Sequence, residues 1–174
     1  MLTVDRPETK NAIDPSVHAA LSAALDAAMA SDARAIVLTG ANGTFVSGGD
    51  LKLIRERPFE ETLTLSQQMT ALLDRLEALP VPVFAAIEGY AFGGGFQLIL
   101  GADMRYVAPD TQLSIMEIRW GLVPDMAGTQ IMRHLAREDI VRELTYTGRR
   151  FSGEEAYEYG FATRVEADPL TAAL

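Results

Sequence analysis

Two segments of the sequence share one design, in which a short apolar strand leads into a glycine-rich loop and then into a helix. In the first, Ile36–Thr39 leads to a first glycine loop at Phe45–Gly49. In the second, Val83–Ile87 leads to a second glycine loop at Gly89–Gly95. Short apolar runs that alternate with helical patterns are typical of buried parallel strands. The repeated order of strand, loop and helix therefore predicts an α/β fold.

Two longer apolar patterns predict helices that pack against this sheet. Asp14 and Pro15 form a strong helix start, with Asp as the N-cap and Pro at the first helical position. Apolar residues then recur every four positions and predict one buried face, made of Val17, Leu21, Leu25 and Met29. A second helix, predicted over 61–78, places on one side Leu65, Met69, Leu72, Leu73 and Leu76.

Shorter elements complete the expected order. Strands are predicted at 2–4, 104–107 and 113–115, and helices at 50–58, 96–102 and 126–135. With 174 residues, the chain is long enough for one domain with a sizeable core and too short for two comfortable ones. We therefore expect a single domain over residues 1–174.

Composition excludes several classes of function. The net charge is −9 and the 15 Lys and Arg residues are scattered, which argues against nucleic-acid binding. The chain has no cysteine, so disulfides and thiolate chemistry are excluded, and no His, Asp or Glu cluster has metal spacing. The most apolar window, 79–102, is interrupted by Glu88, Gln97, prolines and glycines, which makes it a poor membrane span. No signal peptide is visible at the start, and we expect a cytoplasmic protein.

The glycine loops have a possible chemical purpose. Glycine lets a ligand come close to the main chain, and free N–H groups at the start of a helix stabilise an anion. Two such groups that meet at one carbonyl oxygen make an oxyanion hole. The alternative is that Gly93–Gly95 only allows tight packing of a helix on a strand, and the pattern alone leaves both interpretations open.

One carboxylate stands in apolar surroundings. Glu117 lies among Ile115, Met116, Ile118 and Trp120. Such surroundings disfavour the ionised form and raise the pKa of a carboxyl group toward the range that is useful for proton transfer. The alternative is a surface ion pair of Glu117 with Arg119 or another arginine.

The remaining polar candidates are weaker. Asp125 has a competing role as N-cap of the helix that follows it. No pattern makes Glu88, His18 or His134 catalytic.

With these residues in view, the chain resembles the enoyl-CoA hydratase/isomerase (crotonase) family over its whole length. The resemblance rests on four motifs, in the family's order and spacing: Arg6 to Ile13, Phe45 to Leu51, Gly89 to Gly95 with Ala102 to Tyr106, and Glu117 to Pro124 with Gly128 to Gln130. It implies the ClpP/crotonase fold, a spiral of ββα units, here without part of the usual N-terminal strands and C-terminal helices. Those helices usually cover the acyl-CoA and build the oligomer, which leaves activity of the short chain open.

The same resemblance assigns roles to residues. It implies that the N–H groups of Gly49 and Gly94 form an oxyanion hole for a CoA thioester and that Glu117 is the acid/base. It places four residues along the CoA thioester: Lys10, Gly48, Asp50 and Gly93. Coenzyme A would enter as part of the substrate and not as a bound cofactor. A homo-oligomer, trimer or hexamer, is implied as well.

Gln97 departs from the pattern of the family's hydratases, which carry a second Glu at this position. A glutamine side chain can orient a group by hydrogen bonds but cannot exchange protons. Asp125 matches the position of an extra Asp in dienoyl-CoA isomerases. The other carboxylate of those isomerases stands at the position that Gln97 occupies here. The resemblance therefore favours the shift of a double bond, with Glu117 alone as acid/base. Hydration, other enolate chemistry and a non-catalytic acyl-CoA-binding role stay open as alternatives.

Overall fold

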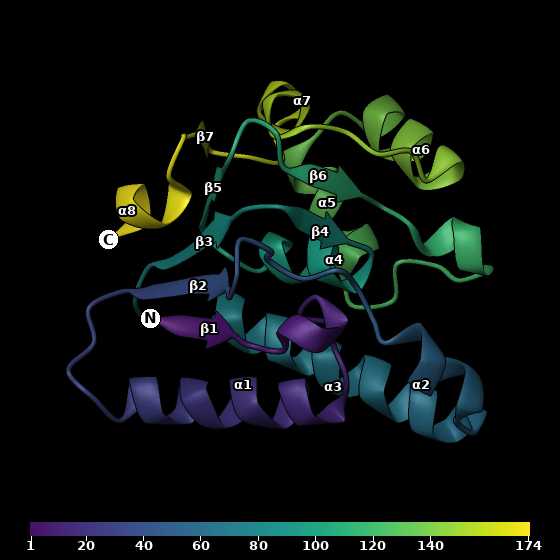
Figure 1. Ribbon diagram of the computed structural model, residues 1–174, viewed down its shortest axis with the longest axis horizontal. Coiled ribbons are helices and arrows are strands. Elements are labelled where there is room, and N and C mark those ends of the chain that lie inside the picture. The colour runs from purple at the N-terminus through teal and green to yellow at the C-terminus, as the bar shows by residue number, and fades with distance from the viewer.

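Two parallel sheets form the centre of the structure, a computed structural model that describes residues 1–174 (Figure 1). The larger sheet has five strands in the order β1 (Leu2–Val4), β2 (Ile36–Gly40), β3 (Val83–Ile87), β5 (Met104–Val107) and β7 (Arg164–Val165). The smaller sheet pairs β4 (Tyr90–Phe92) with β6 (Gln112–Ser114). Every strand pair is parallel, which confirms the predicted α/β class.

Helices α1 (Pro15–Met29) and α3 (Phe59–Glu77) lie side by side along one side of the larger sheet (Figure 1). The predicted start of α1 is confirmed, because the Asp14 carboxylate accepts a hydrogen bond from the N–H of Val17. Both helices bury their predicted apolar faces, with two exceptions. Met29 is 40% exposed because the helix ends there, so its predicted burial is wrong. Leu65 is only half-buried.

The remaining helices are short. They are η1 (Pro7–Thr9), α2 (Leu51–Glu56), α4 (Gly94–Leu100), η2 (Glu117–Trp120), α5 (Gly128–Leu135), α6 (Glu138–Thr147), α7 (Gly153–Tyr159) and α8 (Pro169–Ala173). The predicted helix at 126–135 starts two residues late, at Gly128, because Ala127 has a left-handed conformation with φ of 63°. The elements after Leu135 are additional to the predicted ones. No helix of the structure is both long enough and apolar enough to cross a bilayer.

Part of the second glycine loop is a strand, where the sequence predicts only a loop. Gly89 turns the chain with φ of 63°, and a Cβ there would lie 2.2 Å from the carbonyl oxygen of Gly43. After this turn, β4 pairs with β6 and also exchanges backbone hydrogen bonds with Val46 of the first glycine loop. The two glycine loops are therefore joined directly, main chain to main chain.

The core holds α4 firmly in place. A cluster of 32 buried residues includes Phe96 of α4, whose ring packs edge-to-face against Phe151 and Phe161. The ring centroids are 5.7 and 5.2 Å apart, respectively. Because α4 begins at Gly94, within the second glycine loop, this packing also fixes the position of the end of that loop.

Candidate active site

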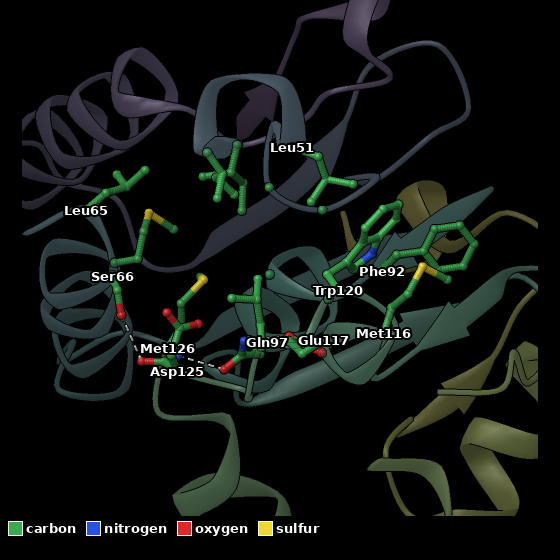
Figure 2. Close-up of a pocket in the computed structure, with 18 of the residues that line it drawn as sticks. Leu51, Leu65, Ser66, Phe92, Gln97, Met116, Glu117, Trp120, Asp125 and Met126 are labelled. Carbon is green, nitrogen blue, oxygen red and sulfur yellow. Dashed lines mark hydrogen bonds between the residues drawn. The ribbon is translucent and has the colours of Figure 1, made fainter. Parts of the chain in front are cut away.

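A cavity of about 230 Å³ lies where the two glycine loops meet α3 and η2. Its wall is mostly apolar, with large side chains from several elements: Ile13, Leu51, Ile54, Leu65, Met69, Phe92, Met116, Trp120, Leu122 and Met126. Seven of the predicted site residues line the same cavity: Gly48, Gly49, Gly93, Gly94, Gln97, Glu117 and Asp125. Figure 2 shows Gln97 and Glu117 next to each other, with Leu51 and Leu65 across the cavity from them.

Gly49 lines the cavity and has a free N–H group. Ile13 pairs with this segment as in a parallel sheet: its N–H donates to the oxygen of Gly48, and its oxygen accepts from the N–H of Asp50. In such a pairing, the N–H of the residue between them points the other way. Accordingly, the N–H of Gly49 donates to no acceptor in the protein.

Gly94 supplies a second donor beside the first. It is the first residue of α4, so its N–H has no acceptor within the helix. A Cβ at this position would lie 3.8 Å from the backbone nitrogen of Gly49, which places the two residues next to each other. The packing interpretation of the second loop is also correct for Gly95, where a Cβ would lie 2.3 Å from the oxygen of Val46. The loop therefore combines tight packing with a donor at the cavity.

Gly93 brings the second glycine loop over the carboxylate of Glu117. Its φ of 49° and ψ of −117° form a backbone conformation that suits glycine. Its N–H donates to the oxygen of Ser114, and a Cβ would lie 3.6 Å from Oε1 of Glu117. Gly48 has φ of 114° and likewise lines the cavity with main chain only.

Glu117 is a buried carboxylate with one satisfied oxygen. The residue is 6% exposed; Oε1 accepts a hydrogen bond from Gln97, and Oε2 has no partner in the protein. Burial raises the pKa of this carboxyl above its ordinary value, and the nearby charge of Asp125 raises the pKa further. The surface ion pair considered for Glu117 is wrong, because Arg119 donates to the oxygen of Gly148 and no arginine contacts the carboxylate.

Gln97 connects Glu117 to the segment at the start of α5. Its Nε2 donates to Oε1 of Glu117 at 2.7 Å. Its Oε1 accepts from the N–H groups of Met126 and Gly128, at 2.8 and 3.1 Å. These two donors were not predicted, because backbone groups that meet a side chain 29 and 31 residues away leave no local signal in the sequence.

Asp125 lies at the exposed rim of the cavity. Its predicted role as N-cap of the next helix is wrong: that cap is Ala127, and no side chain caps the helix. The main-chain oxygen of Asp125 accepts a hydrogen bond from the hydroxyl group of Ser66 (Figure 2) and another from that of Thr70, and both tie this rim to α3.

Two predicted residues lie outside the cavity. Lys10 is exposed, and its Nζ lies 5.4 Å from the centre of the Tyr90 ring. The Asp50 carboxylate accepts from the N–H of Leu53 and caps α2. The structure contains no group of three or more His, Cys, Asp or Glu side chains that could hold a metal ion.

The arrangement has a definite chemical capacity. Two adjacent N–H groups can receive an oxygen that gains negative charge, in an apolar cavity where such donors act strongly. A carboxyl group with a raised pKa can accept and return a proton at a neighbouring carbon. The site therefore suits proton transfer next to a carbonyl group.

Comparisons with known proteins agree with this picture. The family model described as enoyl-CoA hydratase/isomerase matches residues 1–170. The chain is 34% identical over 170 residues to an enoyl-CoA isomerase/hydratase of Zymoseptoria tritici. The matched segment covers 95% of this chain and 56% of that protein. It is 37% identical over 166 residues to a carnitinyl-CoA dehydratase of Salmonella enteritidis, and the match covers 94% of this chain and 63% of that protein.

Solved structures show the same fold. A crystal structure of enoyl-CoA hydratase from Bacillus anthracis matches with a TM-score of 0.90 and 32% sequence identity, over 94% of this chain and 64% of that one. This likeness confirms the fold expected from the sequence. The chain spans between 56% and 64% of the length of these three relatives.

Proposed function

The chain belongs to the enoyl-CoA hydratase/isomerase family, and from this premise we propose that it shifts the double bond of an enoyl-CoA thioester, with Glu117 as its acid/base. One observation carries the choice of reaction: the buried partner of Glu117 is the amide of Gln97 and not a second carboxylate. A single carboxylate is sufficient to move a proton from one carbon to another.

The proposed reaction begins with the thioester oxygen between the N–H groups of Gly49 and Gly94. Glu117 takes a proton from C2 of a 3-enoyl-CoA, and the electron pair of that C–H bond forms a dienolate whose negative charge rests on the thioester oxygen. The protonated Glu117 then gives the proton to C4 as the C3–C4 double bond becomes C2–C3. No water enters and the mass does not change. Each N–H donor stabilises such a charge by about 3 kcal/mol.

The hydrogen bonds of Gln97 support isomerisation over hydration. Addition of water needs a group that removes a proton from the water and a group that protonates the neighbouring carbon. The oxygen of Gln97 already accepts from two backbone N–H groups, and its nitrogen faces Glu117. An amide exchanges no proton, so Glu117 would have to perform both tasks alone.

The shape of the cavity supports an acyl thioester as the substrate. Its apolar wall suits a hydrocarbon chain, and the main chain of Gly48 and Gly93 offers room beside the thioester. We assign the exposed Lys10 to the CoA nucleotide and leave Asp50 a structural role as the cap of α2. Coenzyme A would then enter and leave with the substrate.

Hydration is the second candidate, favoured by one observation. Asp125 supplies a second acidic group at the rim of the cavity, close enough for its charge to act on Glu117. A non-catalytic acyl-CoA-binding role is less well supported. A buried carboxylate with a raised pKa costs stability, and binding of a thioester does not need it.

The proposal includes a homo-oligomer, the trimer or hexamer that the family resemblance implies. Large apolar side chains are exposed beside the cavity, with Ile118, Trp120, Leu122 and Val123 between 43% and 69% exposed. Light scattering of the purified protein tests this part. The cytoplasmic location stays a prediction from the sequence.

The central test incubates the purified protein with 3-enoyl-CoA and, separately, with 2-enoyl-CoA, and follows the products by mass and retention time. Conversion of 3-enoyl-CoA into 2-enoyl-CoA at unchanged mass supports the proposal. Gain of one water by 2-enoyl-CoA, without any isomerisation, would replace it with hydration. Binding of both thioesters without turnover in a folded protein would move the proposal to the non-catalytic role.

A further inference from the structure

The amide of Gln97 has only one orientation that satisfies its surroundings. Two backbone N–H groups, from Met126 and Gly128, converge on one end of the amide. Both are donors, so this end must be the oxygen, because the NH₂ end has no lone pair to accept them. The NH₂ group is therefore turned toward Glu117, and the side chain, at 1% exposure, has no room to exchange its ends.

This orientation distinguishes the two oxygens of Glu117. Oε1 faces a permanent donor, so a proton on that oxygen would oppose the N–H of Gln97. Oε2 is buried and has no partner in the protein. A proton on the carboxyl group therefore belongs on Oε2, where no other donor opposes it.

We propose that Gln97 is a positioning residue that distinguishes the two oxygens of Glu117: Oε1 stays a hydrogen-bond acceptor, and Oε2 is the oxygen that carries the proton whenever the carboxyl group is protonated. The inference rests on the proposed function, since it specifies which oxygen of the proposed acid/base holds the proton. It also gives Gln97 a task in catalysis through Glu117, without any proton transfer of its own.

Gly128 is part of the same device. A Cβ at this position would lie 2.6 Å from Oε1 of Gln97, which is too close for the present arrangement. The oxygen of Gln97 reaches both backbone donors only because position 128 is glycine. Substitution at Gly128 therefore disturbs the orientation of the amide without changing Gln97 itself.

The test compares Gln97→Met and Gly128→Ala with the unchanged protein. Gln97→Met keeps the size of the side chain and removes the donor. Controls are Gln112→Met, at a half-buried glutamine of β6, and Gly101→Ala, where a Cβ makes an ordinary contact of 3.4 Å with Leu73. Circular dichroism and thermal unfolding establish that each variant is folded.

Two spectroscopic readouts report on Glu117 without any need for turnover. Carbon-13 NMR gives the titration midpoint of its carboxyl carbon, and infrared difference spectra give the C=O stretch of its protonated form; Glu117→Gln assigns both signals. In Gln97→Met we expect the midpoint to rise by about one pH unit, the effect of losing a hydrogen bond to a charged group. The C=O stretch should move to higher frequency, because Oε1 no longer accepts a hydrogen bond. Gly128→Ala should change both in the same direction, and the controls should change neither.

Kinetics complete the test. The acid limb of kcat/KM for isomerisation should move to higher pH with the NMR midpoint in both variants. Unchanged midpoint and C=O frequency in a folded Gln97→Met variant would overturn the inference. Moved spectra with an unmoved acid limb would also overturn it, since the hydrogen bond would then have no bearing on proton transfer. Absence of any turnover in the unchanged protein would instead overturn the proposed function, while the two spectra still decide whether Gln97 fixes Oε1.

Discussion

Nε2 of Gln97 lies 2.7 Å from Oε1 of Glu117, and both side chains are almost completely buried. Gln97 sits one turn into α4, the helix whose first residue, Gly94, offers its N–H to the cavity. One short helix thus holds both the proposed oxyanion donor and the hydrogen-bond partner of Glu117, the proposed acid/base. Because the core packs around Phe96, which lies between them in the helix, the two residues are held in a fixed relation to each other.

Removal of the carboxylate tests the acid/base. Glu117→Gln should lower kcat for isomerisation by about 100-fold to 10,000-fold, the usual contribution of a positioned general base. Affinity for a saturated acyl-CoA, measured by calorimetry, should change little, because glutamine has the same shape and can still accept from Gln97. Glu88→Gln is the matched control: Glu88 is half-buried at the end of β3 and does not line the cavity. Equal loss of affinity and of turnover in Glu117→Gln would contradict the assigned role.

The same substitution should stabilise the protein at neutral pH. Burial raises the pKa of Glu117 in the folded state above its value in the unfolded state. The contribution of this group to the free energy of unfolding is therefore fully present at acid pH and is lost as the pH rises through the raised pKa. Glu117→Gln carries no charge to bury, and its Tm at pH 7 to 8 should be higher by about 2–4 °C, the effect of about 1 kcal/mol in a chain of this size. Thermal unfolding between pH 4 and pH 8 checks this, and the difference should shrink toward the acid end. A constant difference across this range would mean that ionisation of Glu117 is not its cause.

A methyl group at Gly94 should obstruct the proposed oxyanion hole. The added Cβ would lie 3.8 Å from the nitrogen of Gly49, in the space proposed for the thioester oxygen, and 3.2 Å from the sulfur of Met126. Gly94→Ala should lower kcat/KM by about 100-fold or more, the effect of losing one donor. Gly101→Ala, at the other end of α4, adds a methyl group with ordinary contacts and serves as the control. Steady-state kinetics with 3-enoyl-CoA measures both, and similar rates for the two variants would exclude Gly94 from the site.

Met69 should limit the length of the acyl chain. Its side chain, 1% exposed, lines the cavity from α3, whereas the equally buried Leu72 of the same helix does not. Met69→Ala and Leu72→Ala should both destabilise the protein by about 2–5 kcal/mol, as buried truncations do. Only Met69→Ala should move the preferred substrate toward longer chains, measured as kcat/KM for a series of 3-enoyl-CoA thioesters. The same preference in both variants would show that the chain does not reach Met69.

Five of the strands, β1, β2, β3, β5 and β6, were predictable because each is a short apolar run beside turn residues, as in Val83–Ile87 and Met104–Val107. Strand β7, only two residues long, was not predicted. The start of α1 was predictable for the same local reason, since Asp14 and Pro15 determine it within one turn. Strand β4 was not, because its pairing depends on β6 and on the first glycine loop, which are distant in the sequence.

Within the site, residue types were easier to predict than contacts. Glu117 could be singled out by its apolar neighbours, and burial of the carboxylate agrees with that prediction. The orientation of Gln97 could not be derived, because it follows from backbone N–H groups that every residue except proline possesses. The residues of the apolar cavity wall could not be predicted either, because Met69 has the same helical spacing as residues that only fill the core.

Restoring a second carboxylate should change the balance of the two candidate reactions. In Gln97→Glu, one carboxylate oxygen would still accept from Met126 and Gly128, while the other would face Oε1 of Glu117 at about the present distance. Two carboxylates so close must share a proton, so the pair should titrate with two apparent pKa values, one of them above that of Glu117 in the unchanged protein.

Such a pair can deprotonate a water molecule and protonate a carbon in one step. We therefore expect hydration of 2-enoyl-CoA to rise and isomerisation of 3-enoyl-CoA to fall, both followed by mass and retention time. Gln97→Met, which offers neither a donor nor a carboxylate, should gain no hydration. A folded Gln97→Glu variant that isomerises as before and adds no water would mean that residue 97 does not separate the two reactions, and isomerisation would lose its main support.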